Sequence, residues 1–158
     1  MANTVAIKVS NLSKDFKGKT ALKNASCTIH EGELVALIGA SGSGKSTLLR
    51  HINGLHIGDA GTIYIFGSII QSEGKIHSKI RSLRSQIGCI FQQFNLVNRL
   101  TVIENVLVGN LSRLSLLRST FHLFTKEEKI QALAALERVG ILEHAYKRAS
   151  MLSGGQQQ

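Results

Sequence analysis

The sequence contains no proline and only two cysteines. Without proline, its turns must be formed by glycine, asparagine, aspartate and serine. Cys27 and Cys89 lie far apart, and neither has a second cysteine at metal-ligand spacing. Each lies in a strand-like segment, so we expect both to be small buried side chains in a reducing compartment. The cysteines therefore argue against a redox role and against a zinc site.

Long hydrophobic runs are also missing. A membrane-spanning helix needs about 20 consecutive apolar residues, whereas the apolar run over residues 34–38 already ends at Gly39. The N-terminus has no basic stretch that leads into an apolar segment, so we expect no signal peptide and a cytosolic location. Hydrophobic residues still make up 43% of the chain, which is typical of a globular domain.

Acidic residues are sparse. The chain has 10 of them against 19 lysines and arginines, for a formal net charge of +9. Such a charge is compatible with nucleic-acid or anionic-membrane binding. The basic residues cluster over 75–84 and 113–129, where solvated helix faces are the simpler interpretation. The interleaved aromatic residues of single-strand binding platforms are absent from the sequence, so we expect no nucleic-acid partner.

Short segments with strand patterns dominate the first part of the chain. They cover residues 5–9, 25–29, 34–38, 61–67 and 87–91. The first two are separated by tight turns and predict an antiparallel sheet. Residues 34–38 are apolar at every position, as in a strand buried on both faces of a parallel sheet, and residues 87–91 predict another buried strand.

Helical patterns follow. They cover residues 46–53, 75–85, 101 onward, and 125 to about 139. The last two begin with capping boxes, in which Thr101 pairs with Glu104 and Thr125 with Glu128. Gly140 ends the final helix. This order predicts a single α/β domain with a nucleotide-binding portion over residues 1–92 and a helical portion over residues 93–158.

The glycine-rich segment between residues 34–38 and the following helix fits the phosphate-loop pattern G-x-x-x-x-G-K-[ST]. Glycines let backbone amides approach phosphate oxygens, and the helix directs its positive end at them. Lys45 would reach the β- and γ-phosphates, and the Ser46 hydroxyl would bind Mg²⁺. The residues predicted to bind ATP here are Gly39, Ala40, Ser41, Gly42, Ser43, Gly44, Lys45, Ser46 and Thr47.

A second motif, Leu-Ser-Gly-Gly-Gln, occupies residues 152–156. With the phosphate loop upstream, the whole chain resembles the ATP-binding subunits of ABC transporters, in which this pentapeptide is the signature motif. The resemblance implies an ABC-type P-loop fold with an N-terminal antiparallel β portion, a partial RecA-like parallel core and a helical subdomain. It also implies a head-to-tail homodimer, in which Ser153, Gly154, Gly155 and Gln156 contact ATP on the partner subunit's phosphate loop.

Two further positions follow from the same resemblance. Phe16 matches the aromatic residue that stacks on adenine, for which its flat π-face is suited. Gln92 matches the glutamine that touches Mg²⁺ and the attacking water and senses the membrane subunit. The implied partners are two membrane-spanning permease subunits and, indirectly, a solute-binding protein. The implied location is peripheral, on the cytoplasmic face of the inner membrane.

Within the family, several stretches resemble the ATPase of phosphonate importers. They are residues 46–51, 91–100, 124–125 and 153–158. Importers of polar amino acids share the Phe-Gln-Gln-Phe-Asn-Leu segment at 91–96. A polar amino acid therefore stays open as the transported substrate. Two more interpretations stay open as well, namely a soluble ABC ATPase that acts on nucleic acid and an inactive gene remnant.

Four parts that the resemblance implies have no counterpart in the 158 residues. These are the core strand with a Mg²⁺-binding aspartate, the glutamate that polarises water, the loop that contacts the dimer partner, and the switch histidine. Phosphoryl transfer depends on positioning and charge stabilisation. We therefore expect the 158 residues alone to hydrolyse no ATP and to be poorly stable.

Overall fold

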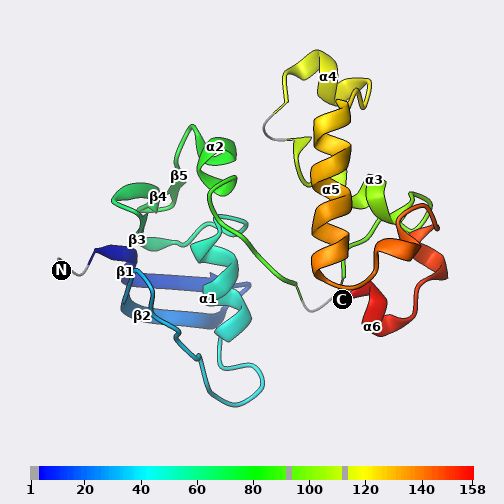
Figure 1. The fold of residues 1–158 in the computed structure, drawn as a ribbon. Helices are drawn as coiled ribbons and strands as arrows, with labels where there is room; N and C mark the ends of the chain where they lie inside the picture. Colours follow the sequence, from blue (N-terminus) through cyan, green and yellow to red (C-terminus); the bar gives the residue numbers. More distant parts are fainter. Residues whose placement is uncertain (1–3, 92–93, 112–113) are drawn as a thin grey trace. The chain divides into compact units, whose positions relative to one another are not determined.

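A computed structural model describes residues 4–91, 94–111 and 114–158. The chain divides into two compact units, Met1–Cys89 and Ile90–Gln158, whose elements are drawn in Figure 1. The first unit is built on a β-sheet and the second on helices.

The sheet of the first unit has five strands in the order β2-β1-β3-β4-β5, and every neighbouring pair is antiparallel. Their bounds are β1 Val5–Phe16, β2 Lys19–His30, β3 Ala60–Ile65, β4 Ser68–Ser72 and β5 Lys75–Ile76. The predicted antiparallel pairing of the first two segments is confirmed, although both strands are longer than their apolar patterns. The turn between them uses left-handed backbone at Lys17 and Gly18, with φ of 48° and 82°.

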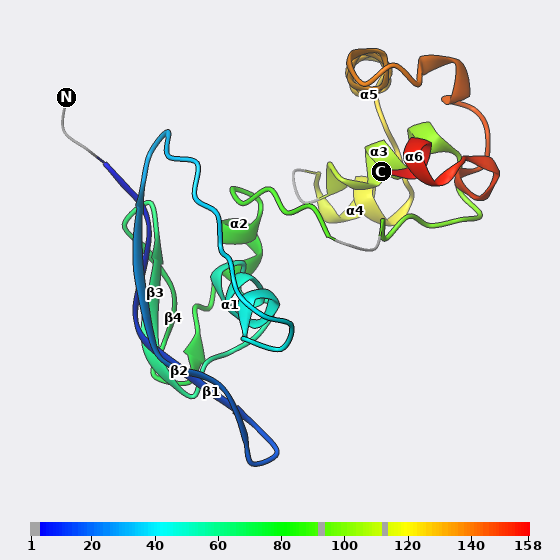
Figure 2. The ribbon, with the colours of Figure 1, turned by 90° about the horizontal axis from the view of Figure 1, so that it is seen from below.

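Two helices, α1 (Lys45–Ile52) and α2 (Ile80–Arg84), cover one face of this sheet, as Figure 2 shows. Alternate residues of β3 are buried, and Ile63 is completely so. The core joins the inward face of the sheet to Leu48 and Ile52 of α1 and to Ile80 and Leu83 of α2. This packing holds the start of α1 close to the β1–β2 hairpin.

The two apolar segments predicted as buried parallel strands form no strand in the structure. Residues 34–38 and 87–91 carry no strand assignment, and Leu34, Ile38 and Ile90 are at least 90% exposed. A doubly buried strand needs hydrogen-bonded neighbours on its edges and cover on both faces. Within the described residues no strand pairs with either segment, so the predicted parallel core does not form there.

Other predictions for the first unit need correction. Cys89 is exposed and Cys27 only half-buried, because Cys89 lies in the unpaired 87–91 segment. The predicted strand over 61–67 ends at Ile65, since Phe66 and Gly67 adopt positive φ in the turn to β4. The predicted helix over 75–85 is instead the short strand β5 followed by α2.

The second unit is helical. Its elements are α3 Val102–Val108, α4 Leu116–Thr120, α5 Lys126–Arg138, the 3₁₀ turns η2 Leu142–His144 and η3 Ala149–Met151, and α6 Gly154–Gln157. Both predicted capping boxes are confirmed, with Glu104 N–H donating to Thr101 Oγ1 at 3.3 Å and Glu128 N–H to Thr125 Oγ1 at 3.2 Å. Gly140 follows α5 at a φ of 73°.

The core of this unit lies between α3 and α5. It contains Val102, Ile103, Leu107, Ala132, Leu136, Ala145 and Leu152. Leu152 directly precedes Ser153, so the start of α6 is anchored to this core. No helix among the described residues is long and apolar enough to cross a membrane.

Candidate nucleotide-binding site

The glycine loop and α1 meet at Gly44, which precedes the helix with φ 92° and ψ 0°. A Cβ atom at this position would lie 2.5 Å from the carbonyl oxygen of Ala21 on β2. Gly44 thus permits both the left-handed backbone and the close approach of the loop to the sheet. The first turn of α1 holds no acidic residue, so its positive end is not neutralised by a carboxylate of that turn.

The Lys45 side chain folds back onto the loop. Its ammonium group donates to the carbonyl oxygens of Gly39, at 2.7 Å, and Ala40, at 2.8 Å. The Ser43 amide donates to the same Ala40 carbonyl at 3.2 Å. These bonds close the loop around the ammonium group and hold a positive charge at the start of the helix.

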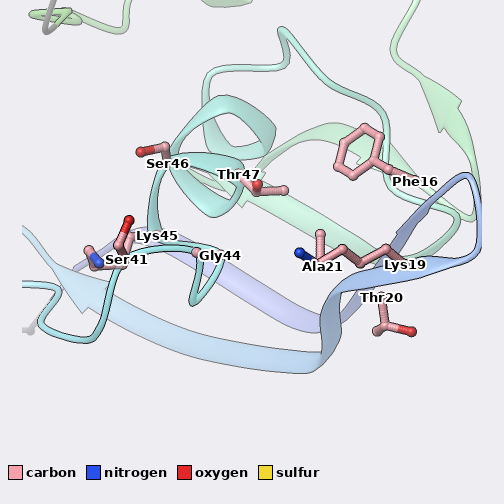
Figure 3. A pocket seen from close by; sticks show the side chains of 10 residues that line it. Phe16, Lys19, Thr20, Ala21, Ser41, Gly44, Lys45, Ser46 and Thr47 are labelled. Carbon is pink, nitrogen blue, oxygen red and sulfur yellow. The ribbon is translucent and has the colours of Figure 1, made fainter.

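A cavity of about 290 Å³ opens between this loop and the β1–β2 hairpin. Figure 3 shows Phe16 and Lys19 coming from the hairpin, and Ser46 and Thr47 from α1. The lining residues are Phe16, Lys19, Thr20, Ala21, Ser41, Gly42, Gly44, Lys45, Ser46 and Thr47. The structure therefore brings Phe16 together with most of the predicted phosphate loop, although they are distant in sequence.

Three predicted loop residues do not line the cavity. Gly39 and Ala40 face Lys45 with their carbonyl groups, and Ser43 is turned toward Ala40. Conversely, the prediction missed Lys19, Thr20 and Ala21, which line the cavity from the start of β2. Only the basic turn at residues 17–19 could have drawn attention to this segment.

A salt bridge lies beside the Phe16 ring. The Lys14 ammonium is 5.5 Å from the ring centroid and 2.6 Å from Asp59 Oδ1. Asp59 also accepts the Asp15 backbone N–H at 2.8 Å. The Asp15 N–H bond, and then the bond from Lys14, hold the pKa of Asp59 below its ordinary value.

Ser153 begins α6 in the second unit and forms a capping box with Gln156. The Gln156 amide N–H donates to Ser153 Oγ at 3.4 Å, and the Ser153 N–H donates to Gln156 Oε1 at 2.9 Å. Gln156 Nε2 lies 2.7 Å from His144 Nε2, a contact that the sequence did not predict. Ser153, Gly154 and Gly155 are exposed.

Gln92, the predicted glutamine of the Mg²⁺ site, lies outside the described residues, as does its neighbour Gln93. Ser46, the other predicted Mg²⁺ ligand, is exposed at the second position of α1. Over residues 4–91, 94–111 and 114–158, no group of three or more histidine, cysteine or acidic residues could hold a metal ion. The described Mg²⁺ donor is thus a hydroxyl, which fits a metal bound chiefly through phosphate and water.

The sequence and the fold both match known proteins. A family model described as "ABC transporter" matches residues 22–158. The chain is 83% identical over 158 residues to the phosphonates import ATP-binding protein PhnC 1 of Nostoc sp. (strain PCC 7120), covering 100% of this chain and 60% of that protein. It is 55% identical over 156 residues to the phosphonates import ATP-binding protein PhnC of Stutzerimonas stutzeri, covering 97% and 56%.

Solved structures agree with these relatives. A dimeric post-hydrolysis state of the ATP-binding cassette MJ0796 bound to ADP and Pi matches with a TM-score of 0.80 and 33% identity, over 96% of this chain and 65% of that one. A nucleotide-free ATP-binding cassette from an ABC transporter matches with a TM-score of 0.77 and 29% identity, over 97% and 61%. The chain therefore spans about three fifths of the length of the proteins it matches.

Proposed function

Because the chain belongs to the ABC transporter family, we propose that the protein is the ATP-binding subunit of an import complex that couples ATP hydrolysis to uptake of phosphonate-type solutes. The observation that carries the proposal is the cavity that joins Phe16 to the glycine loop. The relatives from Nostoc and Stutzerimonas stutzeri, which are named as phosphonate import proteins, support the substrate class.

The residues of the cavity fit an adenine nucleotide. Loop amides and the positive end of α1 would hold the phosphates. Lys45 would exchange its two carbonyl partners for phosphate oxygens, a stronger charge-assisted interaction. Ser46 and Gln92 would hold a Mg²⁺ ion at the phosphates. Bound Mg²⁺ neutralises charge on the phosphates, and Phe16 would stack on the base.

In this proposal the signature residues, Ser153 to Gln156, bind a second ATP molecule. Ser153 Oγ accepts the Gln156 amide, which leaves its O–H free to donate to a phosphate oxygen. Gly154, Gly155 and Gln156 would contact the same nucleotide, held by the phosphate loop of a second copy in a head-to-tail homodimer. The dimeric ATP-binding cassette among the structural matches supports dimer formation. Two permease subunits and a solute-binding protein would complete the complex at the cytoplasmic face of the inner membrane.

Uptake of a polar amino acid is the second candidate, because the Phe-Gln-Gln-Phe-Asn-Leu segment at 91–96 also resembles that of polar amino-acid importers. A growth experiment separates the two. Cells whose chromosomal gene carries Lys45→Ala would grow on inorganic phosphate but not on methylphosphonate as sole phosphorus source. Lys23→Ala, which removes an exposed lysine, is the control and would grow on both. Equal growth of Lys45→Ala cells on methylphosphonate, with lost growth on a polar amino acid as nitrogen source, would support the second candidate.

The expectation that the 158 residues alone hydrolyse no ATP stays a prediction. Steady turnover by the purified 158-residue chain would contradict it. In this proposal ATP binds through the loop, Phe16 and α1, all within the 158 residues, so binding and hydrolysis are separate tests.

A further inference from the structure

The Phe16 ring stands at the end of the β1–β2 hairpin, next to a turn, and is 39% exposed. An exposed aromatic side chain at a hairpin end has several accessible rotamers. Stacking on a base fixes one of them, which costs binding free energy. The ring is supported on one side by His56, at a centroid distance of 5.8 Å and an interplanar angle of 71°. This edge-to-face geometry is the favoured one for aromatic pairs.

His56 is itself fixed through its backbone. Its N–H donates to the Arg50 carbonyl at 3.0 Å. Its carbonyl accepts the side-chain amide of Gln71 at 3.1 Å, and Gln71 is almost fully buried. The same Gln71 amide donates to the His51 carbonyl at 2.7 Å. The segment after α1 is thus tied to β4 through one buried side chain, and His56 has a defined position.

The His56 ring also rests on a second ring. His51 lies edge-to-face to it, with centroids 5.6 Å apart and an angle of 69°. His51 is completely buried on α1, and its Nδ1 lies 2.7 Å from the Thr47 carbonyl oxygen. Because a carbonyl can only accept, Nδ1 carries the proton. Three rings therefore run from Phe16 through His56 to His51, which lies in the last turn of α1 and contacts the Thr47 carbonyl in its first turn.

The charges around His56 favour a neutral imidazole. Burial lowers the pKa of His56, and the nearby Arg50 and Lys14 cations lower it further. Lys14 in turn is held by Asp59. At neutral pH the group behind Phe16 is thus an uncharged aromatic ring.

We infer that His56 is a positioning residue for the base: it fixes the Phe16 ring so that ATP, but not a base-free triphosphate, gains affinity from the contact. The inference rests on the proposed ATP site. No catalytic step passes through His56, because its ring faces Phe16 and His51 and does not line the cavity.

The inference predicts that replacing His56 weakens the binding of ATP but not that of inorganic tripolyphosphate. His56→Ala removes the edge-to-face contact, and ATP should bind about three- to tenfold more weakly, the range expected for one aromatic pair. Inorganic tripolyphosphate occupies only the loop and should bind within about twofold of the unsubstituted protein. His56→Phe keeps an aromatic ring at this place and should restore ATP affinity.

The experiment measures both dissociation constants, with Mg²⁺, by isothermal titration calorimetry on the unsubstituted chain and on the His56→Ala, His56→Phe, Phe16→Ala and His77→Ala variants. His77 is an exposed histidine of the same unit and should change neither constant. A general loss of folding in His56→Ala would weaken both ligands equally, so the ratio of the two constants isolates the effect on the base.

Each outcome decides a claim. If His56→Ala leaves the ratio of the two constants unchanged while Phe16→Ala raises it, the inference on His56 is wrong and the proposed base site stands. If Phe16→Ala also leaves the ratio unchanged, the base does not bind at Phe16. Both the inference on His56 and the proposed base site are then wrong. If the unsubstituted chain is folded by far-ultraviolet circular dichroism and binds neither ligand, the proposed ATP site itself is refuted.

Discussion

Two alanine substitutions in the glycine loop test how closely the loop packs against the sheet. Gly42 and Gly44 both have left-handed backbone, with φ of 80° and 92°. A Cβ at Gly42 meets nothing within 4 Å, whereas at Gly44 it lies 2.5 Å from the Ala21 oxygen and 3.0 Å from Leu22 Cδ2. Gly42→Ala is therefore a matched control that changes the backbone preference alone.

The expected magnitudes follow from these distances. Alanine in the left-handed region costs roughly 1–2 kcal/mol, and both variants share this term. At Gly44 the loop must also move away from backbone atoms of β2, and such overpacking costs roughly 1–3 kcal/mol. We therefore expect Gly44→Ala to lower the free energy of unfolding by about 1–3 kcal/mol more than Gly42→Ala does.

The assay is urea unfolding followed by far-ultraviolet circular dichroism, with an osmolyte such as trimethylamine N-oxide to widen the measurable range. Equal destabilisation by the two substitutions would refute the close packing of the loop on β2. Equal tripolyphosphate binding by both variants would in addition show that the loop does not need this approach to hold phosphate.

Three other predictions concern caps, protonation and thiols. Thr101→Ala should destabilise the chain by about 1 kcal/mol in urea unfolding, whereas Ser115→Ala, whose side chain makes no cap bond, should change stability by much less. The pKa of Asp59 is lowered in the folded chain, so its carboxylate stabilises the fold near neutral pH, and this contribution is lost as pH falls below about 4. The urea concentration at the unfolding midpoint should therefore depend less on pH in Asp59→Asn than in the unsubstituted chain. Cys89 should react with iodoacetamide faster than Cys27, because Cys89 is exposed and burial raises the Cys27 pKa; faster labelling of Cys27 would contradict the structure.

The parts of the fold that depend on near neighbours were predictable from the sequence. A capping box involves residues three apart, so the helices after Thr101 and Thr125 could be located from their first residues. The helix after the glycine loop was also placed to within a residue or so at each end. Each of these signals is local, and the local preference agrees with the final structure.

Predictions that required distant partners were less successful. The apolar runs at 34–38 and 87–91 indicated burial, but a run cannot specify which strands would cover it, and in the structure its residues are largely exposed. The contact of Phe16 with His56 joins the end of one strand to the loop after α1, and that of Gln156 with His144 crosses 12 residues. No periodicity or motif marks either histidine.

The central claim is that the cavity between Phe16 and the glycine loop binds ATP through Lys45. Calorimetric titration of the chain with ATP and Mg²⁺ tests it most directly. We expect one ATP bound per chain, and loss of that binding in Lys45→Ala but not in Lys23→Ala. ATP binding that survives Lys45→Ala unchanged, or no binding by an unsubstituted chain that circular dichroism shows to be folded, would contradict the assignment of this site.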